Sequence, residues 1–440
     1  MAETAYAAVL TAPRTFDYRD IPLPPTGPDE GLLRMEAAGL CGTDYEQFDG
    51  HFTGTKLGQL PMILGHEILG WIERVGHDAA ERWGVREGDR VIVETSIPCG
   101  DCPACRTGRA IFCDADMGYG IRIGYDRPPH LWGGYASHLY LHPKTRMHKV
   151  PDHIPTGAMS LFNPLSNAVR WAGGRPDTRA GQTIVIEGPG QRGLLSVVVA
   201  KEIGAEKIIV TGTRADAHRL ALARQLGADA TITVEDEDPV ARVRELTDGR
   251  GADVVLDVSS GATDPILQGI DMVRKGGTMV VAGLKTHNAL NGFHTDKLIF
   301  NEIAMLGVLS SEWEDTARAV EILTRRWQEL EVLCTHAYPV GEAIEVSGRG
   351  DVGLDRLNGG QLTGGPLEFR GSAGGDDHRG ALLDEDLRDL EPDTAAAARD
   401  EGESIIEEHA YHLHRNGRAR PVMIRGLRAG AKSSITRLGS

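Results

Sequence analysis

Four cysteines lie close together in the stretch SIPCGDCPACRTGRAIFC, which spans residues 96–113 of a chain that has only six cysteines. Their spacing is C-x2-C-x2-C-x7-C, and the glycines and prolines between them favour turns that let thiolates converge on one ion. The pattern predicts a tetrahedral zinc site. Because four thiolates leave no open coordination position, such a zinc would stabilise a loop and take no part in a reaction. The predicted ligands are Cys99, Cys102, Cys105 and Cys113.

Two other uses of clustered thiols fit the sequence less well. A thioredoxin-like redox pair needs a single C-x-x-C, and here two further cysteines are left over. A disulfide framework is typical of secreted proteins. The N-terminal stretch MAETAYAAVLTAPRTF lacks the basic-then-apolar order of a signal peptide. We therefore favour zinc over both.

A second, sparser set of zinc-binding residue types lies upstream. Cys41 stands in GLCGTD, and His66 and Glu67 stand in LGHEILG. A thiolate, an imidazole and a carboxylate would leave one position for water or an alcohol oxygen, which is the arrangement of a catalytic zinc. A cysteine followed by His-Glu also occurs in ordinary protein cores. The catalytic interpretation therefore depends on the rest of the chain.

The middle of the chain has the pattern of a dinucleotide-binding unit. Gly188, Gly190 and Gly193 follow an apolar strand expected at 183–186, precede a helical stretch, and are followed by a second strand expected at 207–210. This is the context that a G-x-G-x-x-G turn needs to bring backbone amides to a pyrophosphate. GADVVLDVSS and GGTMVVAGL read as two further buried parallel strands.

The end of the second strand bears on the choice of cofactor. An NAD site usually has an acidic residue there, whereas this chain has Gly212, Thr213 and Arg214. An arginine suits the 2′-phosphate of NADP(H), which we favour. NAD(H) stays open, because Arg214 could be a solvated loop residue while Asp216 meets the ribose.

In this order the motifs resemble the zinc-containing alcohol and polyol dehydrogenases of the medium-chain dehydrogenase/reductase family. The similar stretches are GLCGTD, GHEILG, VGHDAAERWGVREGDRV, the cysteine loop, GGYASHLYLHPKTRMHKVPD, GPGQRG and RLALARQLGAD. The resemblance implies an α/β chain with a GroES-like, β-rich catalytic domain at 1–163 and a doubly wound Rossmann domain at 164–309. A return segment at 310–346 would complete the first domain. Gly212, Thr213 and Arg214 also resemble the 2′-phosphate clamp of the family's NADP-dependent secondary alcohol dehydrogenases.

The resemblance implies roles for individual residues and one structural and one catalytic zinc. Cys41 and His66 would hold the catalytic zinc, and Thr43 would take the alcohol proton. Glu46 occupies a position where the family often has a relay histidine. The family's further zinc ligand corresponds to Asn163, a poor ligand; Glu67 could replace it, zinc could bind loosely, or Asn163 could cap a helix starting near Pro164.

The last quarter of the chain departs from the family pattern. From residue 347 to 440 it is rich in glycine and arginine and has only two aromatic residues, Phe369 and Tyr411, and the stretch 347–380 follows neither helical nor strand periodicity. Such a segment buries little apolar surface, so we expect disorder. It reads as an extension or as the product of a shifted reading frame, with one conceivable amphipathic helix at about 393–415.

Composition and charge bear on which partners the protein can bind and on where it is located. With 47 basic and 63 acidic residues the formal charge is −16, which disfavours nucleic acid and anionic membranes. There is no long apolar run, so we expect a cytoplasmic protein that spans no membrane.

The predicted function is zinc-dependent hydride transfer between a small alcohol, polyol or amino alcohol, or its carbonyl, and NAD(P), in a homo-dimer or homo-tetramer as the family implies. Trp132 and residues 45–57 are candidates for lining the substrate site. The alternatives are a zinc-independent quinone or enone reductase of the same family and a non-catalytic dinucleotide-binding protein that keeps a structural zinc.

Overall fold

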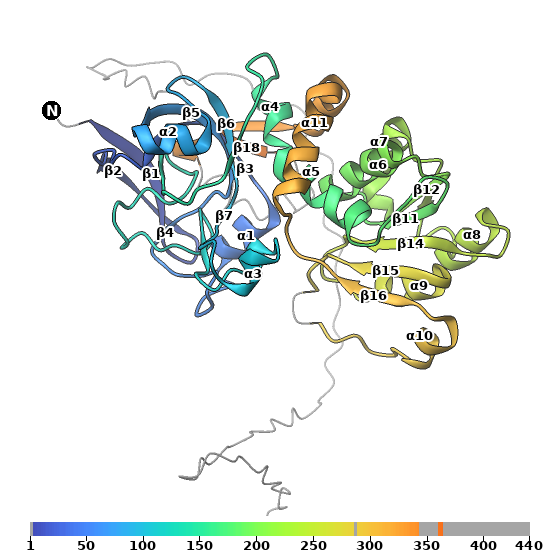
Figure 1. The fold of residues 1–440 in the computed structure, drawn as a ribbon. Helices are drawn as coiled ribbons and strands as arrows, with labels where there is room; N and C mark the ends of the chain where they lie inside the picture. Colours follow the sequence, from blue (N-terminus) through green and yellow to red (C-terminus); the bar gives the residue numbers. More distant parts are fainter. Residues whose placement is uncertain (1–2, 286–287, 343–359, 364–440) are drawn as a thin grey trace, which may run out of the picture. The chain divides into compact units, whose positions relative to one another are not determined.

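The computed structural model describes residues 3–285, 288–342 and 360–363, all of which belong to one compact unit (Figure 1). The unit contains a β-rich part and a part built on a parallel sheet. The helix considered at 393–415, and all of the predicted tail except 360–363, lie outside the described residues.

The β-rich part consists mainly of two sheets. A three-stranded sheet has the order β2-β1-β4, and a larger sheet has the order β10-β6-β5-β3-β18-β17, with β9 also paired to β3. Side chains of these strands contribute to one apolar core, in which Leu33 and Ile68 are fully buried. The strands are β1 (Thr4–Ala12), β2 (Thr15–Pro22), β3 (Gly31–Gly39), β4 (Met62–Ile63), β5 (Glu67–Val75), β6 (Arg90–Val93), β9 (His138–Leu141), β10 (Met147–Lys149), β17 (His336–Pro339) and β18 (Gly360–Thr363).

Short helices and strands lie outside these two sheets, and some of them belong to the cysteine stretch. They are α1 (Gly42–Asp49), α2 (His77–Trp83), the paired strands β7 (Ser96–Ile97) and β8 (Met117–Gly118), α3 (Pro103–Arg106) and the 3₁₀ turns η1 (Ala110–Phe112) and η5 (Val340–Glu342).

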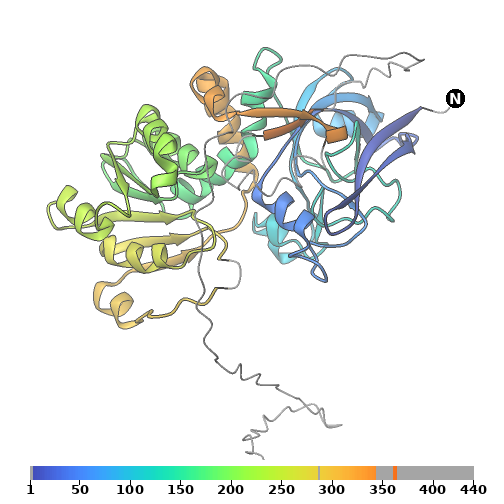
Figure 2. The ribbon, with the colours of Figure 1, turned by 180° about the vertical axis from the view of Figure 1, so that it is seen from behind.

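The second part is a six-stranded parallel sheet with the order β13-β12-β11-β14-β15-β16. The residues of β11 alternate between two apolar clusters, with Ile184 and Ile186 in one and Val185 in the other, so helices cover both faces (Figure 2). The strands are β11 (Thr183–Glu187), β12 (Lys207–Gly212), β13 (Ala230–Thr233), β14 (Ala252–Asp257), β15 (Val273–Val281) and β16 (Ala304–Gly307). The helices are α6 (Gln191–Ile203), η3 (Arg214–Asp216), α7 (Ala217–Leu226), α8 (Pro239–Leu246), α9 (Asp264–Met272) and α10 (Asp296–Asn301).

Five further helical elements complete the described part of the chain, and two of them, η2 and η4, directly continue the helix before them. They are α4 (Thr156–Ser160), α5 (Phe162–Ala168), the π-helical turn η2 (Val169–Gly174), α11 (Trp313–Leu330) and η4 (Glu331–Leu333). The predicted fold class, a β-rich domain beside a doubly wound parallel sheet, is confirmed. The boundaries at 163 and 309 stay predictions, although α5 runs across residue 163.

One strand lies in a segment for which we predicted disorder. Gly360–Thr363 form β18 inside the segment expected to be disordered, parallel to β17 and antiparallel to β3. Backbone hydrogen bonds make this pairing, so it needs no apolar periodicity in the sequence. The chain therefore closes its antiparallel sheet later in the sequence than the family resemblance implies.

Candidate active site and metal centres

The four predicted cysteines of residues 99–113 come together. Their sulfur atoms all lie within 4.8 Å of one another, and all six cysteines of the chain are free thiols. Backbone amides point at the sulfurs, with the Cys99 amide donating to Cys113 Sγ at 3.1 Å. Amide donation from Asp114 and Cys105 lowers the pKa of Cys102 to about 6. Four sulfur atoms this close together fit a tetrahedral zinc.

Cys41 and His66 also converge, as predicted. Cys41 precedes α1 and His66 precedes β5, and Cys41 Sγ lies 3.2 Å from His66 Nε2. Both are buried, with exposed fractions of 7% and 6%. Asp44 completes this group of donor atoms. A buried thiol and imidazole in contact fit a zinc ion better than any purely structural use of two polar groups in a core.

Asp44 is the functional residue that sequence reasoning missed here. Its carboxylate accepts from the backbone amides of Cys41 at 3.0 Å and Gly65 at 3.3 Å, and lies 3.4 Å from His66 Nδ1. Burial disfavours the imidazolium, but the charges of Cys41 and Asp44 outweigh it and raise the pKa of His66. The position of Asp44 behind Nδ1 directs Nε2 toward the thiol. The GLCGTD motif contains this aspartate, three residues after Cys41.

Glu67 lies next to this group but outside it. Its side chain is buried, and Oε1 has no hydrogen-bond partner among the residues described. A Cβ added at Gly39 would lie 2.1 Å from Glu67 Oε2, so only glycine opposite β5 leaves room for the carboxylate. Burial raises the pKa of Glu67, against the lowering effect of His66 and Arg192. Its role as a zinc ligand stays a prediction.

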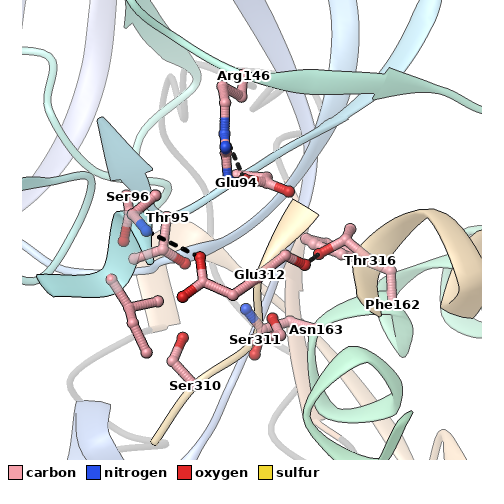
Figure 3. A pocket seen from close by; sticks show the side chains of 12 residues that line it. Glu94, Thr95, Ser96, Arg146, Phe162, Asn163, Ser310, Ser311, Glu312 and Thr316 are labelled. Carbon is pink, nitrogen blue, oxygen red and sulfur yellow. Dashed lines mark hydrogen bonds and ion pairs between the residues drawn. The ribbon is translucent and has the colours of Figure 1, made fainter. Parts of the chain in front are cut away.

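Asn163 lines a cavity of about 20 Å³, enough for one water molecule. The cavity has Asn163, Ser311 and Glu312 on one side and Glu94 with Arg146 on the other (Figure 3). Thr95, also in the lining, donates to the carbonyl of His66 at 2.8 Å, which connects this cavity to the metal ligands.

The alternative that Asn163 caps a helix is wrong. Helix α5 begins one residue earlier, at Phe162, directly after α4, so Asn163 lies inside it. There its Oδ1 accepts from Asn167 Nδ2 at 3.4 Å.

The glycine turn has the predicted geometry. β11 ends at Glu187, Gly188 takes φ +103°, and α6 begins immediately after Gly190. A Cβ on Gly193 would lie 2.0 Å from the Gly188 carbonyl oxygen, so the helix can approach the turn only with glycine there. Strand, turn and helix N-terminus thus follow one another as predicted from the sequence, and the binding of a pyrophosphate there stays a prediction.

The residues after β12 already form hydrogen bonds within the protein. Thr213 donates to the Asp216 carboxylate from its amide at 3.0 Å and from its hydroxyl at 2.7 Å. Arg214 is exposed, and its Nε donates to Asp236 Oδ1 at 2.7 Å while its backbone amide donates to Glu235. Asp216 therefore caps this turn, and the Arg214 guanidinium remains accessible to solvent.

Thr43 and Glu46 share one face of α1, three residues apart. Glu46 contacts His51 Nδ1, and His51 Nε2 lies 3.3 Å from Asp49 Oδ2. His51 is half exposed. The sequence did not single it out, because it follows Cys41 by ten positions in a stretch without a recognised pattern.

Comparison with known proteins identifies the family. Residues 27–152 match the alcohol dehydrogenase GroES-like domain, and residues 193–325 match the zinc-binding dehydrogenase domain. A protein of Mycobacterium tuberculosis named as an alcohol dehydrogenase is 42% identical over 72% of this chain and 86% of its own length. The chain belongs to the zinc-containing alcohol dehydrogenases of the medium-chain family.

Other proteins similar to this chain are also named as dehydrogenases. D-arabitol-phosphate dehydrogenase of Enterococcus avium is 32% identical over 73% of this chain and 87% of its own length. An alcohol dehydrogenase structure from Thermotoga maritima superposes with a TM-score of 0.74 at 28% identity, covering 82% of this chain and all of that one. A Sinorhizobium meliloti structure bound to NADP superposes with a TM-score of 0.68 at 25% identity, covering 78% and 95%.

These findings confirm the predicted class of function. The alcohol dehydrogenase is a zinc-dependent oxidoreductase that acts on alcohols and uses a nicotinamide cofactor. The quinone reductase and the non-catalytic alternatives are not favoured. In the part of the chain that the structure describes, no helix has the length and apolar character to cross a bilayer.

Proposed function

We propose that this alcohol dehydrogenase oxidises a small alcohol, polyol or amino alcohol at the Cys41–His66 centre and passes the hydride to NAD(P)⁺. The observation that carries this proposal is the buried contact between Cys41 Sγ and His66 Nε2, with Asp44 behind the imidazole. Zinc bound by these ligands supplies Lewis acidity at the alcohol oxygen. Asp44 keeps the imidazole oriented, and the Rossmann turn at Gly188–Gly193 holds the hydride acceptor.

The products define the proton balance. The alcohol loses a hydride from carbon to the cofactor and a proton from oxygen, giving a carbonyl compound and NAD(P)H. We infer that Thr43 takes the oxygen-bound proton and that Glu46 and His51 pass it to solvent. The contact of Glu46 with His51, and the half exposure of His51, support this path from α1 to water.

Glu46→Gln is expected to lower kcat about tenfold, because an amide cannot carry the proton. The affinity for NAD(P)H should stay unchanged, and added imidazole should restore part of the rate. The matched control is Glu73→Gln, which alters another carboxylate–histidine pair, with His138 at 3.1 Å. Equal kcat values for Glu46→Gln and wild type over the whole pH profile would exclude Glu46 from proton transfer.

We propose NADP(H) as the preferred cofactor. Two observations support a 2′-phosphate at this position. The Arg214 guanidinium is exposed, and the Asp216 carboxylate already accepts hydrogen bonds from Thr213. The Arg214–Asp236 pair would have to open, which costs little because both side chains are more than half exposed.

Arg214→Asp should lower the ratio of kcat/KM for NADP⁺ over NAD⁺ at least ~10-fold, since it replaces an attraction to the 2′-phosphate with a repulsion. Initial rates with both cofactors measure this ratio. Arg242→Asp is the control, because Arg242 is another ion-paired surface arginine of this sheet's helices. A ratio that does not move in Arg214→Asp means that Arg214 does not meet the phosphate.

The decisive experiment for the function is a panel of alcohols, polyols and amino alcohols assayed with NAD⁺ and NADP⁺ on zinc-loaded protein. Reduction of either cofactor, with two zinc ions per chain, is the expected result. Tight cofactor binding without turnover of any class would instead favour the non-catalytic alternative.

We also propose a homo-oligomer assembled through β16. This strand is an edge of the parallel sheet, and large apolar side chains are exposed on and beside it, including Phe300 at 80%, Leu309 at 52% and Met305 at 37%. An exposed apolar edge strand favours pairing with another copy. Light scattering on the full chain tests this, and a monomer at micromolar concentration would refute it.

We place the protein in the cytoplasm, because a reducing compartment keeps the four cysteines of the loop available for zinc. Cell fractionation tests the location.

A further inference from the structure

Arg192 forms no ion pair with any residue that the structure describes. It lies within the glycine turn, between Gly190 and Gly193, in the first turn of α6. Its Nε is buried and forms no hydrogen bond, and the guanidinium makes no ion pair with a described side chain. A guanidinium presents five N–H donors in one plane, and leaving buried donors unused costs about 1–3 kcal/mol each. Such a group needs an acceptor from elsewhere.

The guanidinium is held on the active-site side of the turn. It lies over the ring of Trp171, 5.5 Å from the centroid, and Trp171 Nε1 donates to the carbonyl of Ser310 at 2.9 Å. Ser310 lines the same cavity as Thr95, which hydrogen-bonds the His66 carbonyl. Arg192 is thus in contact with Trp171, which is bonded to one lining residue of the cavity, and Thr95 on the same cavity is bonded to the metal-ligand segment.

One carboxylate that Arg192 influences lies beside the metal ligands. Arg192 acts electrostatically on Glu67, a buried carboxylate whose Oε1 also lacks a hydrogen-bond partner. Glu67 and Arg192 form no ion pair with each other, and each keeps one buried polar atom without a hydrogen-bond partner, Oε1 in Glu67 and Nε in Arg192. In the proposed reaction, cofactor and substrate meet between the glycine turn and the metal ligands.

We propose that Arg192 binds an anionic phosphate or carboxylate group of a molecule in the active site. The source is either the pyrophosphate of the cofactor or an acidic substituent on the alcohol. The turn position favours the first, because helix N-termini attract pyrophosphate, and the connection to the metal centre is compatible with the second. This inference rests on the proposed function, since it assigns the ligand of the same site.

The test uses Arg192→Gln and Arg192→Lys in the full, zinc-loaded chain. The control is Arg325→Gln, which removes an arginine paired with Glu202 on the surface. In the first arm, fluorescence titration gives Kd for NADPH and for ADP-ribose. In the second, kcat/KM is compared for a polyol and its phosphate monoester. Zinc content and thermal denaturation are recorded for every variant.

If the cofactor is the source, both Kd values rise at least tenfold in Arg192→Gln and recover partly in Arg192→Lys. If the substrate is the source, Kd stays unchanged and the phosphate-over-neutral ratio of kcat/KM falls at least tenfold. Unchanged values in both arms overturn the proposal. So does a loss of zinc in Arg192→Gln, because Arg192 would then act on the metal centre through Glu67.

The binding arm also separates this inference from the proposed function. A chain that binds NADPH and loses that affinity in Arg192→Gln, yet oxidises no alcohol, would support the role of Arg192 and contradict the proposed reaction.

Discussion

Cys41→Ser should reduce the zinc content from two ions to one per chain and lower kcat/KM for alcohol oxidation at least ~10³-fold. A serine hydroxyl is a much weaker zinc ligand than a thiolate, and without Cys41 the imidazole of His66 lacks the donor that lies 3.2 Å from it. Lewis-acid assistance contributes several kcal/mol to the transition state, which corresponds to a loss of this size. Metal analysis and steady-state kinetics measure the two effects.

The chain offers a matched control for this substitution. Cys334 lies outside both cysteine groups, and its Sγ donates to the Gly157 carbonyl at 2.8 Å, a bond that a serine can replace. Cys334→Ser should keep both zinc ions and near-normal activity. If Cys41→Ser kept both ions and its activity, the reaction would not occur at this centre.

Cys102→Ser should remove the other zinc ion and lower the free energy of unfolding by at least ~4 kcal/mol. From Cys99 to Cys113 only Ala110, Ile111 and Cys113 are buried, so a zinc ion bound there would be the main source of order in this loop. Cys102 Sγ also accepts the Cys105 amide at 3.5 Å, which caps the short helix α3. Denaturant unfolding with zinc analysis measures both losses.

The same substitution should affect catalysis less than Cys41→Ser does. A buried hydrogen bond connects the loop to α11: the Ala110 amide donates to Glu312 Oε2 at 3.0 Å, and Glu312 caps α11. A disordered loop would weaken this contact and reduce kcat only moderately. A Cys102→Ser variant that loses zinc without losing stability would show that this zinc is not structural.

Patterns that depend on neighbours in the sequence predicted most of the site. The glycine turn needs a strand, close backbone approach and a helix within ten residues, and all three were readable at Gly188–Gly193. The cysteine loop is equally local. Cys41 and His66 are twenty-five positions apart, and their contact could be expected only from the family resemblance, because antiparallel pairing of β3 with β5 brings them together.

The features that sequence reasoning missed depend on three-dimensional packing. Asp44 orients His66 because α1 starts at Gly42 and presents that carboxylate to the next segment. Arg192 occupies a variable position of the glycine motif, so the sequence assigns it no role. The structure shows that it lies over Trp171, influences Glu67, and forms no ion pair with the described residues. The start of α5 was misplaced because α4 leads directly into it, which shifts Asn163 from a cap to an interior position.

The late position of β18 in the sequence determines when β3 can complete its pairing during synthesis. β18 pairs with Ala37–Gly39 of β3, the strand that ends just before Cys41, and it is synthesised after the whole parallel sheet. On the ribosome, the contiguous parallel sheet of residues 183–307 has all its strands while β3 still lacks this neighbour. The edge of β3 beside the metal ligands stays unpaired until residue 363 has been translated.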